Sequence, residues 1–154
     1  MEKKREILEE QIRQALTSAY KVISDKLINI KPRNKTLDIK SLDFSEIKDL
    51  KNVTDYIRLR ANTDSKALKL RFSDKDIYNE NHPKNPALRE IYRLSEIMRC
   101  EILGSKMLKG ISKNINENYI QKINLKRKDQ LKSKDDVNVS EAFELYMLKN
   151  FLDI

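Results

Sequence analysis

The sequence predicts a mainly α-helical single domain of four or five helices, and three observations lead to this expectation. The chain has 154 residues, which is the length of one ordinary domain. It contains only 2 Gly and 3 Pro, so residues that interrupt helices are rare. Apolar residues recur at steps of three and four along several segments, which is the spacing of one face of an α-helix.

The chain is expected to begin with an amphipathic helix from about Glu2 to Asp25. Its apolar residues fall at helical steps, at Ile7, Leu8, Ile12, Leu16, Ala19, Val22 and Ile23. One small β-hairpin near residues 27–40 is an open option, because two short β-rich runs flank the turn-like residues 32–35. Two short strands alone are only marginally stable. Residues 43–46 have capping-box spacing and predict the start of a short helix.

A longer helix is expected in the middle of the chain, from about Val53 to Phe72. Its stripe runs through Val53, Ile57, Ala61, Asp64 and Leu68. Ser73 with Asp76 again has capping spacing, which predicts a short helical turn. Residues 82–84 read as a loop.

The strongest local signal is Asn85-Pro86, because Asn caps helices and Pro is favoured at the first helical position. The helix from Pro86 is expected to be long, with helical spacing kept as far as Ile115. Gly104 and Gly110 lie within it, and either could mark a break, a kink or a close helix crossing. Residues 122–136 are charged and predict a linker or frayed helix. The capping box 138–141 then starts a last amphipathic helix, whose apolar residues are Phe143, Tyr146, Met147, Phe151 and Leu152.

The composition limits the classes of function. The net charge of +8 is consistent with a polyanionic partner, but Lys, Ile and Asn make up about a third of the chain, and a biased genome has the same effect. One cysteine, Cys100, excludes an internal disulfide, and one histidine, His82, offers no histidine cluster for a metal. No apolar run approaches the ~20 residues of a membrane span, and the charged N-terminus has no signal core. The cytoplasm is therefore the expected location.

No catalytic, cofactor-binding or metal-binding motif is present in the sequence, and a glycine-rich phosphate loop is absent. What stands out is charge on apolar faces. Arg60 and Asp64 are four residues apart, and Glu101 lies three after Met98 with Arg99 beside it. We favour a partly buried polar network that orients helices. The alternative is a patch that contacts a partner or ligand. Cys100 is expected to be a small core residue.

Two stretches resemble the N-terminal domain of the T subunit of aerobic cobaltochelatase, the CobT family. The first is RANTDSKALKL at residues 60–70. The second combines PKNP at 83–86 with RCEILGSK at 99–106, and continues to Gly110 and Asn114. This chain differs from the family pattern at Asn62, because the family often has a histidine near this position. The acidic linker and the C-terminal von Willebrand factor A domain of the family are absent from residues 1–154, which resemble a single helical domain.

The resemblance implies a scaffold or adaptor domain that is not catalytic by itself. The implied complex is a ligase that inserts Co²⁺ into hydrogenobyrinic acid a,c-diamide in cobalamin biosynthesis, using ATP and Mg²⁺. The implied partners are the AAA+ ATPase S subunit and the large N subunit, within an oligomeric assembly. Arg60, Asp64, Arg99 and Glu101 would be its informative polar positions. Two alternatives stay open: an adaptor of an AAA+/von Willebrand factor A chaperone with another client, and a basic helical nucleic-acid-binding domain.

Overall fold

The computed structural model describes residues 2–24, 47, 50–127 and 137–152, and every element in these parts is helical. The helices are α1 (Glu2–Ser24), α2 (Val53–Phe72), α3 (Lys75–Glu80), α4 (Pro86–Met107), α5 (Lys109–Arg127) and α6 (Val139–Phe151). The mainly α fold class is confirmed. The described parts hold six helices where four or five were expected. The hairpin option at 27–40 and the helix start at 43–46 lie outside the described residues.

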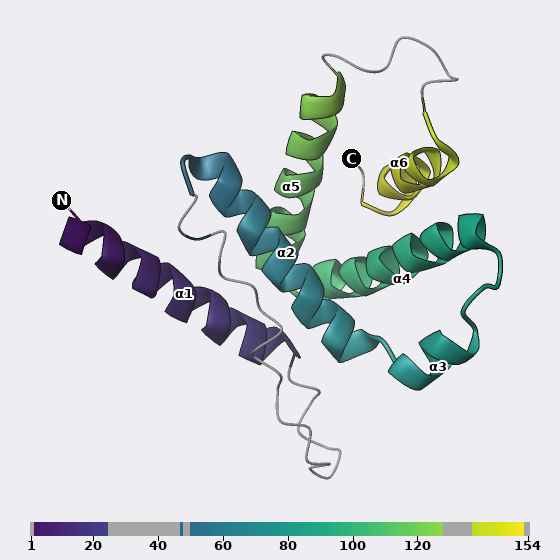
Figure 1. Ribbon diagram of the computed structural model, residues 1–154, viewed down its shortest axis with the longest axis horizontal. Coiled ribbons are helices and arrows are strands. Elements are labelled where there is room, and N and C mark those ends of the chain that lie inside the picture. Colours follow the sequence, from purple (N-terminus) through teal and green to yellow (C-terminus); the bar gives the residue numbers. More distant parts are fainter. Residues whose placement is uncertain (1, 25–46, 48–49, 128–136, 153–154) are drawn as a thin grey trace.

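Helix α2 is the centre of the arrangement, because it contacts α1, α4 and α5. Helices α4 and α5 diverge from a junction behind α2, and α6 lies against α4 near the C-terminus (Figure 1). The main core gathers around this junction, with Leu68 of α2, Met98 of α4 and Ile115 of α5 among its most buried members. A second, smaller core joins α1 to α2 through Leu16 and Leu59.

Side-chain caps fix two of the helix starts as the sequence predicts. Asn85 caps α4 by accepting a hydrogen bond from the Ala87 N–H at 2.9 Å, with Pro86 at the first helical position. Asn138 caps α6 by accepting from the Glu141 N–H at 2.8 Å. At α3 the predicted cap is wrong. Asp74 accepts from the backbone of the first turn in place of Ser73.

The long helix expected from Pro86 is interrupted, and the interruption falls at Leu108. This residue has an extended backbone, with φ −136° and ψ 112°, so α4 ends and α5 begins around it. The Leu108 carbonyl then accepts from the N–H groups of Ile111 and Ser112 at 3.0 and 3.1 Å, which opens α5. Neither glycine makes the break.

Gly104 instead permits a close crossing of α2 and α4. A Cβ placed there would lie 2.9 Å from Cγ of Leu68 and closer still to both of its methyl carbons. A Cβ at Gly110 would meet nothing within 4 Å. The two glycines therefore have different roles, because only Gly104 is needed for packing.

Helix α5 continues to Arg127, so the helical alternative holds for residues 122–127, while residues 128–136 lie outside the described residues. The apolar face expected for α6 is wrong in part. The buried side of α6 carries Glu144, Leu148 and Leu152, while Tyr146 and Phe151 are exposed. Helical steps of four from Glu144 give this buried row, so a charged residue occupies a place where the sequence suggested only apolar ones.

Candidate functional site

Asp64 lies at the crossing of α2 and α5 and is fully buried, with 0% of its side chain exposed. Arg60 Nε donates to Asp64 Oδ2 at 3.2 Å, and Asn114 Nδ2 of α5 donates to the same oxygen at 2.7 Å. The other oxygen, Oδ1, has no hydrogen-bond partner. Burial raises the pKa of Asp64, and the Asn114 hydrogen bond and the Arg60 charge oppose that rise only in part.

Glu101 lies at the junction of α2, α4 and α5. The Tyr119 hydroxyl of α5 donates to Glu101 Oε2 at 2.7 Å, and the Ser65 side chain of α2 also hydrogen-bonds this carboxyl. Burial raises the pKa of Glu101, although both hydrogen bonds lower it. Beside this pair, Lys122 Nζ of α5 donates to Glu144 Oε1 of α6 at 2.6 Å. The Glu101 and Glu144 carboxyls thus connect α2, α4 and α6 to α5.

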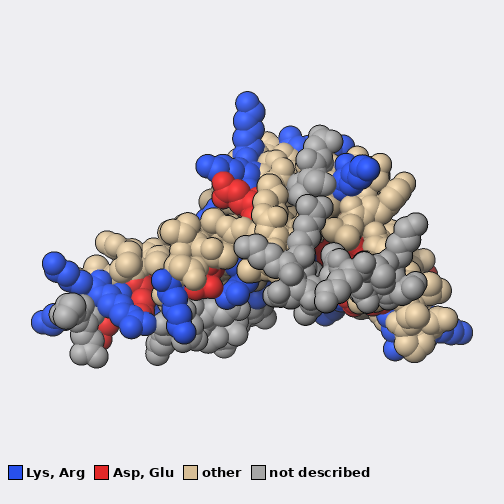
Figure 2. Space-filling view, turned by 90° about the horizontal axis from the view of Figure 1, so that it is seen from above, with Lys and Arg blue, Asp and Glu red and all other residues tan. Residues whose placement is uncertain are grey.

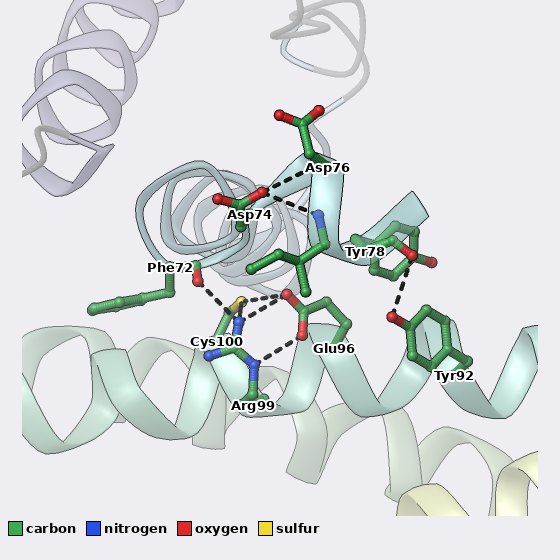
Figure 3. Close-up of polar contacts among 9 residues, drawn as sticks. Phe72, Asp74, Asp76, Tyr78, Tyr92, Glu96, Arg99 and Cys100 are labelled. Carbon is green, nitrogen blue, oxygen red and sulfur yellow. Dashed lines mark hydrogen bonds and ion pairs between the residues drawn. The ribbon is translucent and has the colours of Figure 1, made fainter. Parts of the chain in front are cut away.

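Arg99 lies in a different place, at the corner where α2 leads into α3 and both meet α4 (Figure 3). Its guanidinium forms two 2.8 Å hydrogen bonds with Glu96, and Nη2 donates to the Phe72 carbonyl at 2.9 Å. The Arg99 hydrogen bond lowers the pKa of Glu96. Arg99 therefore closes the end of α2 and is not the ion-pair partner of Glu101.

The four polar positions singled out in the sequence are thus divided among three clusters. Arg60 and Asp64 are brought together, as their spacing predicts. Glu101 and Arg99 have separate partners. The sequence reasoning gave no role to Tyr119, Lys122 or Glu144. Helical spacing was the available signal for Tyr119, because it follows Ile115 by four positions on the buried face of α5.

Cys100 and His82 occupy the environments expected of them. Cys100 is a core residue with 0% exposure, and burial raises the pKa of its thiol to about 11. His82 is exposed, and its ring lies edge-on to Tyr78 and Tyr92, which stack on each other at 4.9 Å. Tyr92 donates to the Tyr78 carbonyl at 3.2 Å, which holds α3 on α4 (Figure 3).

A cavity of about 400 Å³ opens beside the Asp64 cluster, between the end of α1, the middle of α2 and the start of α5. Its charged and polar lining consists of Arg60, Lys109, Lys113 and Asn114, and the remaining lining is apolar apart from Gly110. Arg60 and Asn114, the two side chains that hold Asp64, therefore also form part of the cavity wall. This geometry offers positive charge next to an apolar surface.

Two further properties concern only the described parts of the chain. No helix in them combines the length and apolar character that a membrane crossing requires. Their His, Cys, Asp and Glu side chains form no group of three or more that could hold a metal ion. Basic side chains occur in several separate groups on the face seen in Figure 2, with acidic side chains between some of them.

Comparison with known proteins identifies one family. The family model described as "Cobalamin biosynthesis protein CobT" matches residues 8–151. No curated protein and no solved structure matches the chain. The matched range runs from α1 to α6 and includes the Asp64 and Glu101 clusters and the cavity.

Proposed function

Because this chain belongs to the family of the cobalamin biosynthesis protein CobT, and so to cobalamin biosynthesis, we propose that it is a scaffold and adaptor domain of aerobic cobaltochelatase. In this role it joins the AAA+ ATPase S subunit to the large N subunit in the cytoplasm. The complex inserts its substrate Co²⁺ into hydrogenobyrinic acid a,c-diamide, driven by ATP with Mg²⁺. The observation that carries the proposal is the family match across residues 8–151.

The arrangement of buried charge supports a rigid scaffold. In the described residues three carboxyl side chains are buried, and each accepts a hydrogen bond from α5: Asp64 from Asn114, Glu101 from Tyr119 and Glu144 from Lys122. These three bonds fix α2, α4 and α6 around one helix. Buried carboxyls need hydrogen-bond or ion-pair partners, and the directions of these bonds favour one packing of the helices. A domain that binds two partners at once needs surfaces whose relative orientation is fixed.

The first turns of α1 supply a surface for the contact with the ATPase. This end of α1 projects past the body of the domain (Figure 1), and Ile7 and Leu8 are 58% and 55% exposed there. Apolar side chains on a projecting amphipathic helix are suited to enter a groove of another protein. We therefore place the S-subunit contact at the N-terminal end of α1.

Gel filtration of this chain with the S-type AAA+ subunit of the same genome, with and without ATP and Mg²⁺, tests the adaptor role. We expect co-elution that depends on nucleotide. The variant Ile7→Asp/Leu8→Asp should abolish co-elution without unfolding the domain, because both side chains are exposed. Leu125→Asp is the matched control, since Leu125 is 72% exposed on α5 and lies outside the proposed contact. Separate elution of the wild-type chain under every condition would contradict the proposal.

The client is tested by adding the large N subunit. Under the chelatase hypothesis, the large subunit joins the nucleotide-dependent complex and the three proteins elute together. A complex that forms with the ATPase and excludes the large subunit would favour the remodelling-chaperone alternative. The proposal therefore separates into two steps that can fail independently, the ATPase contact and the chelatase client.

A further inference from the structure

The cavity between α1, α2 and α5 is open to solvent, and its lining combines apolar side chains with cations. Its volume of about 400 Å³ lies within the range of ligand pockets in proteins, roughly 300–1,000 Å³. Apolar side chains form one part of the wall, among them Val22, Ile23 and Ile111. The polar part carries three cations and no carboxylate. A ligand that matches both parts has a hydrocarbon body and a negative group.

The positive charge of the polar part is only partly compensated. Arg60 donates through Nε to the buried Asp64. Lys113 is paired with Glu117 at 3.7 Å, but both side chains are well exposed, so this pair holds the lysine weakly. The Lys109 side chain has no hydrogen-bond or ion-pair partner among the described residues. The cavity therefore keeps an excess of positive charge beside an apolar wall.

The start of α5 adds backbone donors to the same end of the cavity. The first four N–H groups of a helix lack partners within the helix. Two of them, those of Ile111 and Ser112, donate to the Leu108 carbonyl. The remaining two belong to Lys109 and Gly110, which both line the cavity. The space beside Gly110 is open, because no atom other than those of its chain neighbours and its own helix backbone lies within 4 Å of the position of a Cβ.

The side-chain charge at the start of α5 is opposite in sign to the charge that stabilises this end of a helix. Acidic residues stabilise the positive end of a helix, whereas cations there are unfavourable. The first turn of α5 contains no acidic residue and begins with Lys109. A bound anion would compensate both this lysine and the helix end. A locally unfavourable arrangement of charge beside a cavity is often found at binding sites.

We propose that this cavity binds a small organic carboxylate with an aliphatic body. The carboxylate lies between Lys109, the backbone N–H of Gly110 and Arg60. The hydrocarbon part lies against Val22, Ile23 and Ile111. Asp64 acts as a positioning residue, because it holds Arg60 and Asn114 at the wall of the cavity. The inference does not depend on the adaptor role, since it rests on the lining of the cavity and on the start of α5.

Amide NMR of the full chain tests this binding directly, because the protein has only two glycines. We would titrate the ¹⁵N-labelled protein with cyclohexanecarboxylate, with the neutral isostere cyclohexanecarboxamide and with inorganic phosphate. The carboxylate should shift the Gly110 amide in a saturable way and leave that of Gly104, buried at the α2–α4 crossing, unchanged. The dissociation constant should be roughly millimolar for a ligand of this size. The carboxamide and phosphate should bind at least about tenfold more weakly.

Two variants separate the site from general surface charge. Lys109→Gln should weaken carboxylate binding by about tenfold, because it removes a charge-assisted hydrogen bond. Lys106→Gln removes a charge that is also exposed, from the last turn of α4 and outside the cavity, and should leave binding unchanged. Gly110→Leu should abolish binding by filling the open space, with thermal unfolding confirming that the fold is intact.

Several results would overturn the proposal. Equal affinity for the carboxylate and the carboxamide would remove the role of charge, and equal affinity for phosphate would reduce the site to a general anion patch. Absence of any saturable shift with the carboxylate would exclude a small-molecule site. If only an acetylated Leu-Glu-Leu peptide amide shifted Gly110, the cavity would be a protein-docking site instead.

Discussion

Replacing each of the two glycines by alanine should change stability in opposite directions. At Gly104 the new Cβ would lie under 3 Å from three side-chain atoms of Leu68, which is only 1% exposed. Leu68 must therefore move within a filled core. Overpacking of this kind costs about 1–3 kcal/mol, and three close atoms favour the upper part of that range, about 2–3 kcal/mol. Alanine regains about 1 kcal/mol of helix propensity. The net destabilisation is about 1–2 kcal/mol.

At Gly110 the added methyl group meets no atom, so only the conformational effect remains. Gly110→Ala should stabilise the fold by about 0.4–1 kcal/mol. The two variants should therefore differ by roughly 2 kcal/mol, although each makes the same chemical change. Urea unfolding followed by far-ultraviolet circular dichroism measures this difference, and the m-value should stay constant.

A double-mutant cycle identifies Leu68 as the cause. Leu68→Ala alone should cost about 2–5 kcal/mol because it leaves a cavity. In that background Gly104→Ala has no clash and fills part of the space, so the two changes should show a favourable coupling of about 2 kcal/mol. Additive effects, or a Gly104→Ala variant as stable as Gly110→Ala, would refute the close crossing of α2 and α4.

Three further predictions concern buried titratable groups. Burial raises the pKa of Asp64 above its ordinary 3.8, so the wild-type protein loses stability as pH rises through the folded-state pKa. The Asp64→Asn variant has no carboxyl to ionise, so in urea titrations its stability should increase relative to that of the wild type from about pH 4 upwards. A difference that does not change with pH would contradict this assignment. Tyr119→Phe should cost about 1–3 kcal/mol in the same assay, because Glu101 loses a buried donor, and a loss below about 0.5 kcal/mol would mean that this bond is not formed. Cys100 should react with a thiol reagent near pH 8 far more slowly than in urea, because it is buried and its pKa is about 11; equal rates would show an open core.

Features of the fold that depend on local chemistry could be predicted from the sequence. The caps at Asn85 and Asn138 are formed by a side chain and a backbone N–H two or three residues later, so the signal lies within one turn. The Arg60–Asp64 pair is likewise a four-residue contact on one helix face. The family resemblance carried by residues 60–70 and 83–106 also proved correct.

Features that depend on tertiary contacts could not be predicted in this way. Asp64 is held by Asn114, which is 50 positions away, and no local pattern identifies that partner. The break at Leu108 has no glycine or proline to mark it. Arg99 and Glu101 are neighbours in the sequence but have separate partners for a simple reason. Residues two apart on a helix do not face each other, whereas Glu96 lies three positions from Arg99 and does.

The most direct test of the central claim is a reconstituted cobalt-insertion assay. The large N-type subunit and the S-type ATPase of the same genome are mixed with hydrogenobyrinic acid a,c-diamide, Co²⁺, ATP and Mg²⁺, and incorporation is followed by the absorbance of the tetrapyrrole. Insertion should depend on this chain and should be lost with Ile7→Asp/Leu8→Asp while persisting with Leu125→Asp. An insertion rate that is the same with and without the chain would contradict the adaptor role.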